Sequence, residues 1–157
     1  MRDARKRTVT NQVATTQHLA RGHAAKRGGK VLEAGLRPTL VVLSEDASVL
    51  AVVAEADFRN WRVEGRSASG DGRDLLTLPN IRMVIFDDEK VVVSDRGWML
   101  GRIRLHAPQA AILYIAHLHD WDTERQARTG GAQYYCSKPI DRAVFAEVVN
   151  SFLRSIK

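Results

Sequence analysis

The sequence lacks the features that mark a disulfide-stabilised, secreted or membrane protein. Cys136 is the single cysteine among 157 residues, so no disulfide can form within the chain. No apolar run approaches the roughly 18 residues that a membrane-spanning helix needs. The N-terminus is basic, but no apolar stretch follows it as in a secretory signal. We therefore expect a cytoplasmic protein that has no membrane partner.

Common catalytic and cofactor-binding motifs are also missing. The sequence contains no glycine-rich phosphate loop, no zinc motif and no recognisable nucleophile–base pair, so we expect neither a cofactor-binding motif nor an ordinary enzyme. The string from His117 to Asp120 has metal-ligand residue types. It supplies too few ligands for a site by itself, and we interpret its histidines as loop residues.

Positive charge is concentrated at one end of the chain. Residues 1–37 hold nine Lys and Arg against two acidic residues, a net charge of +7, whereas the rest holds fifteen against sixteen. Few large apolar residues accompany this charge, which predicts a basic, flexible tail over 1–37 and a folded domain over 38–157. Such a tail can bind nucleic acid through phosphate contacts, but a solubilising tail is the favoured interpretation and nucleic acid is an unlikely partner.

From Thr39 onward, short apolar runs alternate with amphipathic segments of helical length, which predicts an α/β domain with a parallel sheet. Unbroken apolar runs are typical of strands that are buried on both faces. We expect five strands and five helices. The strands include residues 40–43, 61–66, 83–86, 111–115 and 133–136. The helices include residues 46–58, 95–105 with Asp95 as N-cap, 121–129 and 141–156.

Polar residues follow these strands at the edge where parallel α/β sheets bind ligands. Ser44, Glu45 and Asp46 follow the first strand, and Asp87, Asp88 and Glu89 follow the third. Ser137, Lys138 and Pro139 follow the last. Carboxylates from two strands favour a divalent cation such as magnesium, and a lysine opposite them provides a counter-charge for an anion.

Three segments together resemble response-regulator receiver domains of the chemotaxis-regulator type. Residues 40–50 resemble the first strand, its acidic pair and the first helix, and Met83–Asp87 resembles the third strand with its terminal aspartate. Residues 131–139 are similar to the fifth strand with its aromatic residue, lysine and proline. The resemblance spans residues 38–156. It implies a doubly wound (βα)5 fold of the flavodoxin-like type, with strand order 2-1-3-4-5.

The resemblance implies a role for each of these residues. Asp87 would accept a phosphoryl group, and Lys138 would contact it. Magnesium would be bound by Glu45, Asp87 and the backbone carbonyl of Glu89, more weakly than usual because Ser44 replaces a carboxylate. The reaction would be at most self-phosphoryl transfer, with a sensor histidine kinase or phosphotransfer protein as donor.

Signalling in this family passes from the site to a surface. Because the chain ends at Lys157, directly after the last expected helix, we expect a stand-alone receiver that acts through protein–protein interaction with an output protein of unknown identity. By analogy, the fourth and fifth helices (121–129 and 141–156) would form the contact face and a possible homodimer interface.

The switch positions depart from the family pattern. Ile115 stands where the fourth strand should end in Ser or Thr, and Tyr135 occupies the aromatic position that reports the active state. With Ser44, the isoleucine leaves a second hypothesis open: a phosphorylation-independent pseudo-receiver that serves as an interaction or dimerisation module.

Overall fold

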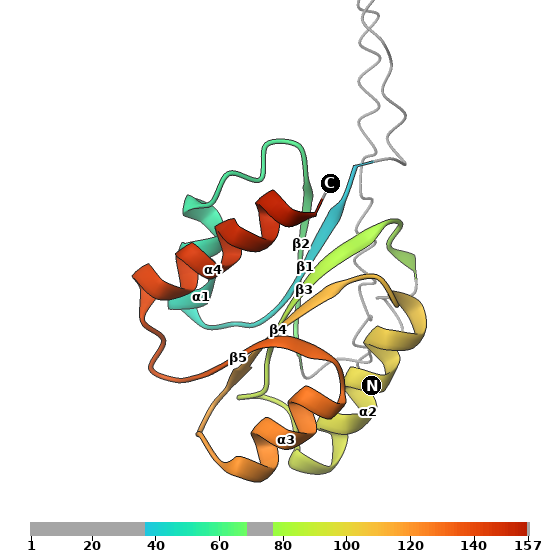
Figure 1. Ribbon diagram of the computed structural model, residues 1–157, viewed down its shortest axis with the longest axis vertical. Helices are drawn as coiled ribbons and strands as arrows, with labels where there is room; N and C mark the ends of the chain where they lie inside the picture. The colour runs from blue at the N-terminus through green and yellow to red at the C-terminus, as the bar shows by residue number, and fades with distance from the viewer. Residues whose placement is uncertain (1–36, 69–76, 157) are drawn as a thin grey trace, which may run out of the picture. The chain divides into compact units, whose positions relative to one another are not determined.

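One five-stranded sheet organises the protein. The computed structural model describes residues 37–68 and 77–156. All neighbouring strands run parallel, in the order β2-β1-β3-β4-β5 (Figure 1). The strands are β1 (Thr39–Leu43), β2 (Arg62–Arg66), β3 (Ile81–Asp87), β4 (Ala111–Ala116) and β5 (Ala132–Ser137). The predicted doubly wound sheet and its strand order are confirmed.

Helices cover both faces of the sheet, which explains why the central strands are apolar without polar alternation. Buried side chains of α1 (Ala47–Glu55) and α4 (Arg142–Ser155) pack on one face. Those of α2 (Val93–His106) and α3 (Trp121–Thr129) pack on the other face. Every residue of β1 and β4 is buried, whereas the edge strand β2 is largely exposed.

Aspartates begin three of the four helices in the described part of the chain. Asp46, Asp120 and Asp141 each accept a hydrogen bond from a backbone amide of the first turn, which is the usual role of an N-cap aspartate. The prediction that Asp95 caps α2 is wrong. The helix begins two residues earlier at Val93, so Asp95 lies inside its first turn and Val92 is the N-cap residue without a side-chain bond.

The described residues contain four helices, where five were predicted. The place for the remaining helix, between β2 and β3, includes residues 69–76, which lie outside the described part of the chain. The predicted tail over 1–37 lies outside it too, apart from Arg37, and stays a prediction. No helix in the described ranges is both long enough and apolar enough to cross a membrane.

Candidate functional site

The carboxyl ends of β1, β3 and β5 bring a serine, an aspartate and a lysine together. Asp87 is the last residue of β3 and is only 3% exposed. Its Oδ2 accepts a hydrogen bond of 2.6 Å from the Ser44 hydroxyl and lies 2.9 Å from Nζ of Lys138. Its Oδ1 accepts a bond of 3.1 Å from the amide of Glu89. Both oxygens of the predicted phospho-acceptor are therefore held in place.

Lys138 is the centre of a charged cluster. Its ammonium lies 2.8 Å from Oδ2 of Asp46, 2.9 Å from Oδ2 of Asp87 and 2.5 Å from Oε2 of Glu89. The lysine side chain is 13% exposed, so it is largely shielded from water. One cation thus faces three carboxylates, and these four groups carry a net negative charge when all are ionised.

Proton equilibria in the cluster follow from these contacts. Hydrogen bonding to Lys138 is the largest influence on Asp46 and on Glu89, and it lowers the pKa of both carboxyls. Burial by itself would lower the pKa of Lys138, but its hydrogen bonds to the carboxylates raise it above the usual value. These directions favour the charged forms of Asp46, Glu89 and Lys138 around neutral pH.

A cavity of about 460 Å³ opens beside Asp87. Its lining includes the first-strand acidic segment and the loop after β3: Ser44, Glu45, Asp46, Ala47, Ala68, Asp87, Glu89 and Lys90. Glu45 lies in this lining, but its carboxylate accepts a hydrogen bond of 2.8 Å from the Ser67 hydroxyl. The cavity has room for a small anion next to the Asp87 carboxylate.

The carboxylates that lie close enough to share a cation differ from the predicted ligand set. Oxygens of Asp46, Asp87 and Glu89 lie within 4.8 Å of one another. This group includes Asp46 and the Glu89 side chain, whereas the predicted ligands were Glu45, Asp87 and the backbone carbonyl of Glu89. A set of three carboxylate oxygens suits magnesium, a hard cation that keeps several waters. The same three carboxylates contact the Lys138 ammonium, so a metal ion and the lysine compete for them. Glu45 stays a prediction as a ligand.

Ile115 and Tyr135, the two predicted switch positions, lie on opposite faces of the sheet. Ile115 packs with α1 and α4 side chains, whereas Tyr135 packs on the α2 and α3 side. Ile112, Tyr114 and Ala116 are the β4 residues that share the face of Tyr135, and Ala116 is the last of them. Ile115 and Ala116 are the last two residues of β4, and neither carries a hydroxyl. This end of the strand therefore lacks the Ser or Thr of the family pattern at both positions.

Asp88 is the polar residue whose position the sequence did not reveal. It is fully buried, and its carboxylate accepts hydrogen bonds from the Tyr114 hydroxyl and from the amide of His117. Arg96 forms an ion pair with it at 3.1 Å. The sequence does show a second acidic residue, Asp88, directly after a buried strand. It does not show which residues would bind the carboxylate, because Arg96, Tyr114 and His117 lie in other elements.

The loop histidines do not assemble a metal site. His117 and His119 belong to no group of potential ligands in the described part of the chain, where Asp46, Asp87 and Glu89 form the one such group. Nδ1 of His119 lies 3.3 Å from the Tyr135 hydroxyl, and its ring packs edge-on against Trp121. His119 therefore packs against β5 and α3, whereas Nδ1 of His117 lies 3.9 Å from Oε1 of Glu89.

No protein-family model matches the sequence, and no curated protein matches it either. Solved structures do resemble the fold. A response regulator from Thermotoga maritima is 21% identical, with a TM-score of 0.61 over 76% of this chain and 99% of that one. A CheY-like receiver domain protein from Methanospirillum hungatei JF-1 is 18% identical, with a TM-score of 0.61 over 76% and 95%.

A third similar structure is the BeF3-activated receiver domain of DrrB, which is 22% identical and has a TM-score of 0.56. The match covers 74% of this chain and 97% of that domain. The similarity therefore extends over nearly the full length of each of these receiver structures. At these identities the comparison establishes that the chain has the receiver fold.

Proposed function

We propose that this chain is a response-regulator receiver domain whose Asp87 accepts a phosphoryl group in two-component signalling. The observation that carries the proposal is the convergence of Asp87, Ser44 and Lys138 at the carboxyl edge of the receiver fold, beside an open cavity. An aspartate with a lysine 2.9 Å away at this edge pairs a nucleophile with a counter-charge for a phosphoryl oxygen.

In the proposed reaction, a phosphoryl group moves from a nitrogen or oxygen atom of the donor to a carboxylate oxygen of Asp87. An Asp87 carboxylate oxygen forms a bond to phosphorus while the bond from phosphorus to the donor breaks. A nitrogen leaving group departs with a proton that is supplied by solvent, whereas acetyl phosphate releases the acetate anion. Positioning and charge neutralisation account for most of the catalysis of such transfers. The Glu89 amide orients Asp87, and the Lys138 ammonium is available to the incoming phosphoryl oxygens.

Magnesium fits the donor set of the site. When bound, it would neutralise charge on the phosphoryl oxygens. Asp46, Asp87 and Glu89 are the carboxylates that would hold it, with Glu45 close by in the same cavity. Because the ammonium already neutralises part of this cluster, and Ser44 supplies no charge, we propose weaker magnesium binding than a fourth carboxylate would give.

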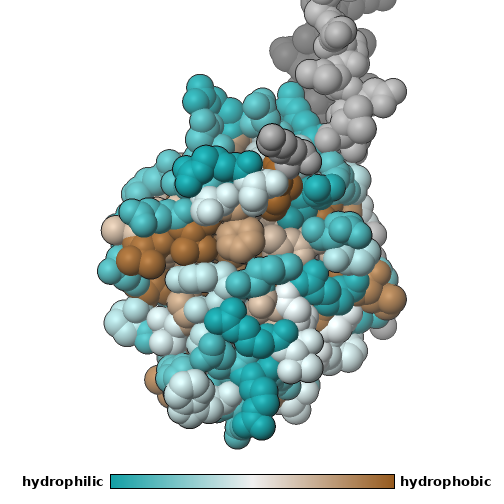
Figure 2. Space-filling view, in the orientation of Figure 1, coloured by the Kyte–Doolittle hydropathy of each residue, from teal (hydrophilic) through white to brown (hydrophobic). Residues whose placement is uncertain are grey.

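The partners follow from the proposed chemistry. A sensor histidine kinase or a phosphotransfer protein would supply the phosphoryl group, and a protein partner would read the result. The predicted contact face for a protein partner consists of α3 and α4. In Figure 2, hydrophobic side chains gather beside α4 and toward the centre of the view, whereas the surface at the α3 end is mostly hydrophilic. Val144 of α4 is half exposed. A homodimer through α3 and α4 is part of the proposal.

The decisive experiment is phosphorylation of the purified chain by acetyl phosphate or phosphoramidate with magnesium, followed by intact mass measurement. We expect one phosphoryl adduct on the wild type and on Asp122→Asn, a matched control with a highly exposed aspartate. We expect none on Asp87→Asn. The adduct should disappear after mild alkaline treatment, because an acyl phosphate hydrolyses readily.

The absence of any adduct on the wild type, with both donors and up to millimolar magnesium, would contradict the proposal. The pseudo-receiver hypothesis would then take its place, and the charged cluster around Lys138 would be a structural ion-pair network. An adduct that persists in Asp87→Asn would also contradict it, because another residue would be the acceptor.

A further inference from the structure

A buried carboxylate directly after the proposed phospho-acceptor binds side chains of β4 and α2 and the backbone of the loop after β4. Asp88 follows β3, and its side chain is fully buried. Oδ2 accepts a hydrogen bond of 2.8 Å from the hydroxyl of Tyr114 on β4, and lies 3.1 Å from the guanidinium of Arg96 on α2. Oδ1 accepts a hydrogen bond of 2.6 Å from the amide of His117, the first residue after β4.

The Asp88 carboxylate has an ion-pair partner, and both of its oxygens accept hydrogen bonds. A buried carboxylate is costly unless it is paired and hydrogen-bonded. Arg96 supplies the opposite charge and is itself mostly buried. Burial, and then the negative charge of Asp88, raise the pKa of Tyr114, so the tyrosine stays protonated and remains a donor. Each oxygen of Asp88 thus has a defined partner, which restricts the carboxylate to one orientation.

The loop over residues 117–120 is held at both ends. At its start the His117 amide is bonded to Asp88. At its end Asp120 caps α3 through the amides of Asp122 and Thr123, and its carboxylate also feels the charge of Arg96. The loop is therefore fixed to the buried Asp88 at its start and to the first turn of α3 at its end.

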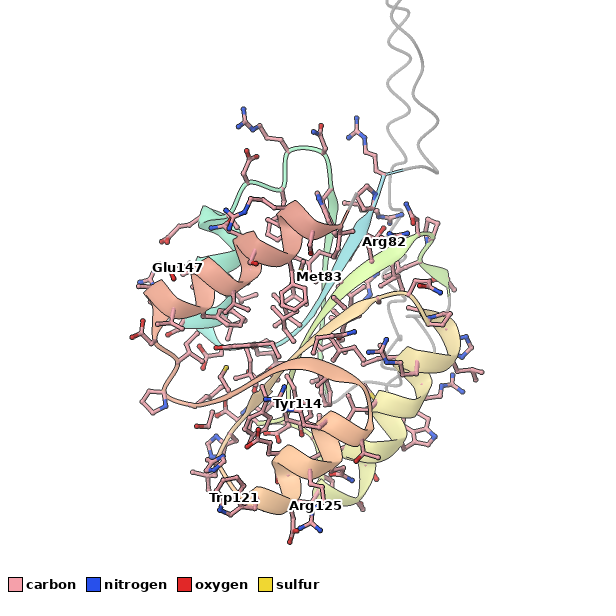
Figure 3. The ribbon with its side chains drawn as sticks, in the orientation of Figure 1. Arg82, Met83, Tyr114, Trp121, Arg125 and Glu147 are labelled. Carbon is pink, nitrogen blue, oxygen red and sulfur yellow. The ribbon has the colours of Figure 1, made fainter. Side chains whose placement is uncertain are left out.

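Aromatic side chains connect the buried Asp88 site with the protein surface. Tyr114 and Tyr135 lie stacked with ring centroids 5.8 Å apart, and the Tyr135 hydroxyl contacts His119 of the loop. His119 packs against Trp121, whose side chain is 76% exposed. Figure 3 shows Tyr114 in the interior and Trp121 at the outer end of α3. The contacts run continuously from Asp88 to the exposed indole.

We propose that Asp88 is a positioning residue that holds the loop over 117–120, and with it Trp121, in one place regardless of the state of Asp87. Two observations carry this. The end of β4 has no hydroxyl that could contact a group on Asp87, because Ile115 and Ala116 stand there. The His117 amide, the first donor after β4, is already bonded to Asp88. Independence of the loop from the state of Asp87 rests on the proposed function.

The anchoring itself is tested by NMR on the uniformly labelled full chain. In Asp88→Asn the charge is removed and the shape is kept, so we expect the His117 amide to exchange with solvent about tenfold faster or more. The Trp121 indole resonance should shift. Exchange at the core amide of Leu113 should stay close to the wild-type rate, because it reports global rather than local opening.

Two further variants keep this test decisive. Tyr135→Phe removes the contact with His119 but leaves every donor to Asp88, so the His117 amide should keep its wild-type protection. If Asp88→Asn does not fold, Asp88→Asn combined with Arg96→Met removes both charges together and is measured instead. Unchanged His117 exchange in the folded Asp88 variant, within about twofold of wild type, would overturn the proposal.

Independence from Asp87 is tested by adding beryllofluoride and magnesium to the wild type. We expect the amide of Glu89, which donates to Asp87, to shift while the amide of His117 and the Trp121 indole stay in place. Joint movement of all three signals would overturn the claim of a fixed loop. No movement anywhere near Asp87 would count against the proposed function instead, and the Asp88→Asn exchange result would still decide whether Asp88 anchors the loop.

Discussion

Replacing Lys138 by methionine should reverse the pH dependence of stability. In the wild type, the ammonium lies between 2.5 and 2.9 Å from the carboxylates of Asp46, Asp87 and Glu89. Methionine has a similar length but no charge, so Lys138→Met leaves these carboxylates to repel one another without a counter-ion. Asp87 suffers most, because its side chain is only 3% exposed.

The magnitude can be bracketed from burial. Exposed ion pairs contribute about 0–1 kcal/mol, whereas removing one partner of a fully buried pair costs about 3–5 kcal/mol. Lys138 and Asp87 are mostly buried, but Asp46 and Glu89 are partly open to water. We therefore expect a loss of about 2–4 kcal/mol in the free energy of unfolding at pH 7. At a urea m-value of about 1–3 kcal/mol/M, the midpoint should fall by at least about 0.7 M.

The sign of the pH effect separates this explanation from a simple packing defect. In the wild type, the lowered pKa values of Asp46 and Glu89 contribute stability that is present above about pH 4 and is lost as the pH falls further. In Lys138→Met, mutual repulsion raises carboxyl pKa values in the folded state. Protonation then stabilises the folded form, so the variant should gain stability between pH 7 and pH 5, where the wild type stays nearly constant.

Urea denaturation followed by circular dichroism at pH 7 and pH 5 measures both effects. Lys90→Met is the matched control, because Lys90 lines the same cavity and is exposed. We expect it to change stability by less than about 0.5 kcal/mol. Equal effects of the two substitutions, or an identical pH dependence for Lys138→Met and wild type, would refute the assigned role of Lys138.

Further predictions concern the site and the core. Ser44→Asp adds a carboxylate next to Asp87, so it should bind magnesium more tightly than wild type in an NMR titration and be less stable without the metal; equal affinities would count against the proposed ligand cluster. Phe145→Ala removes a ring that is 1% exposed and should cost about 3–5 kcal/mol in urea unfolding, whereas a loss below about 1 kcal/mol would mean that α4 packs differently. Burial raises the pKa of Cys136 to about 11, so iodoacetamide at pH 8 should alkylate it roughly a hundredfold more slowly than a free thiol; alkylation at the rate of glutathione would contradict this.

Local patterns in the sequence were sufficient for most of the fold. The unbroken apolar runs ended up as strands with both faces covered, and the strand limits moved by two residues or fewer. The helix over 121–129 has the predicted bounds. Helix faces were less predictable. On α1, Leu50 is 42% exposed while Val52 is buried, because the orientation of a short helix depends on the sheet beneath it.

The sequence alone determined that Asp87 and Lys138 would meet, because residues that follow parallel strands gather at one edge whatever the details of packing. Tertiary structure decided which other side chains join them. Asp46 approaches Lys138 and Glu45 turns to Ser67, a choice that depends on how α1 begins. The partners of Asp88 include Tyr114 on β4 and Arg96 on α2. The sequence alone does not say how far apart the side chains of such elements lie in the folded protein. Local periodicity thus specifies elements and edges, whereas side-chain partners depend on packing between segments far apart in sequence.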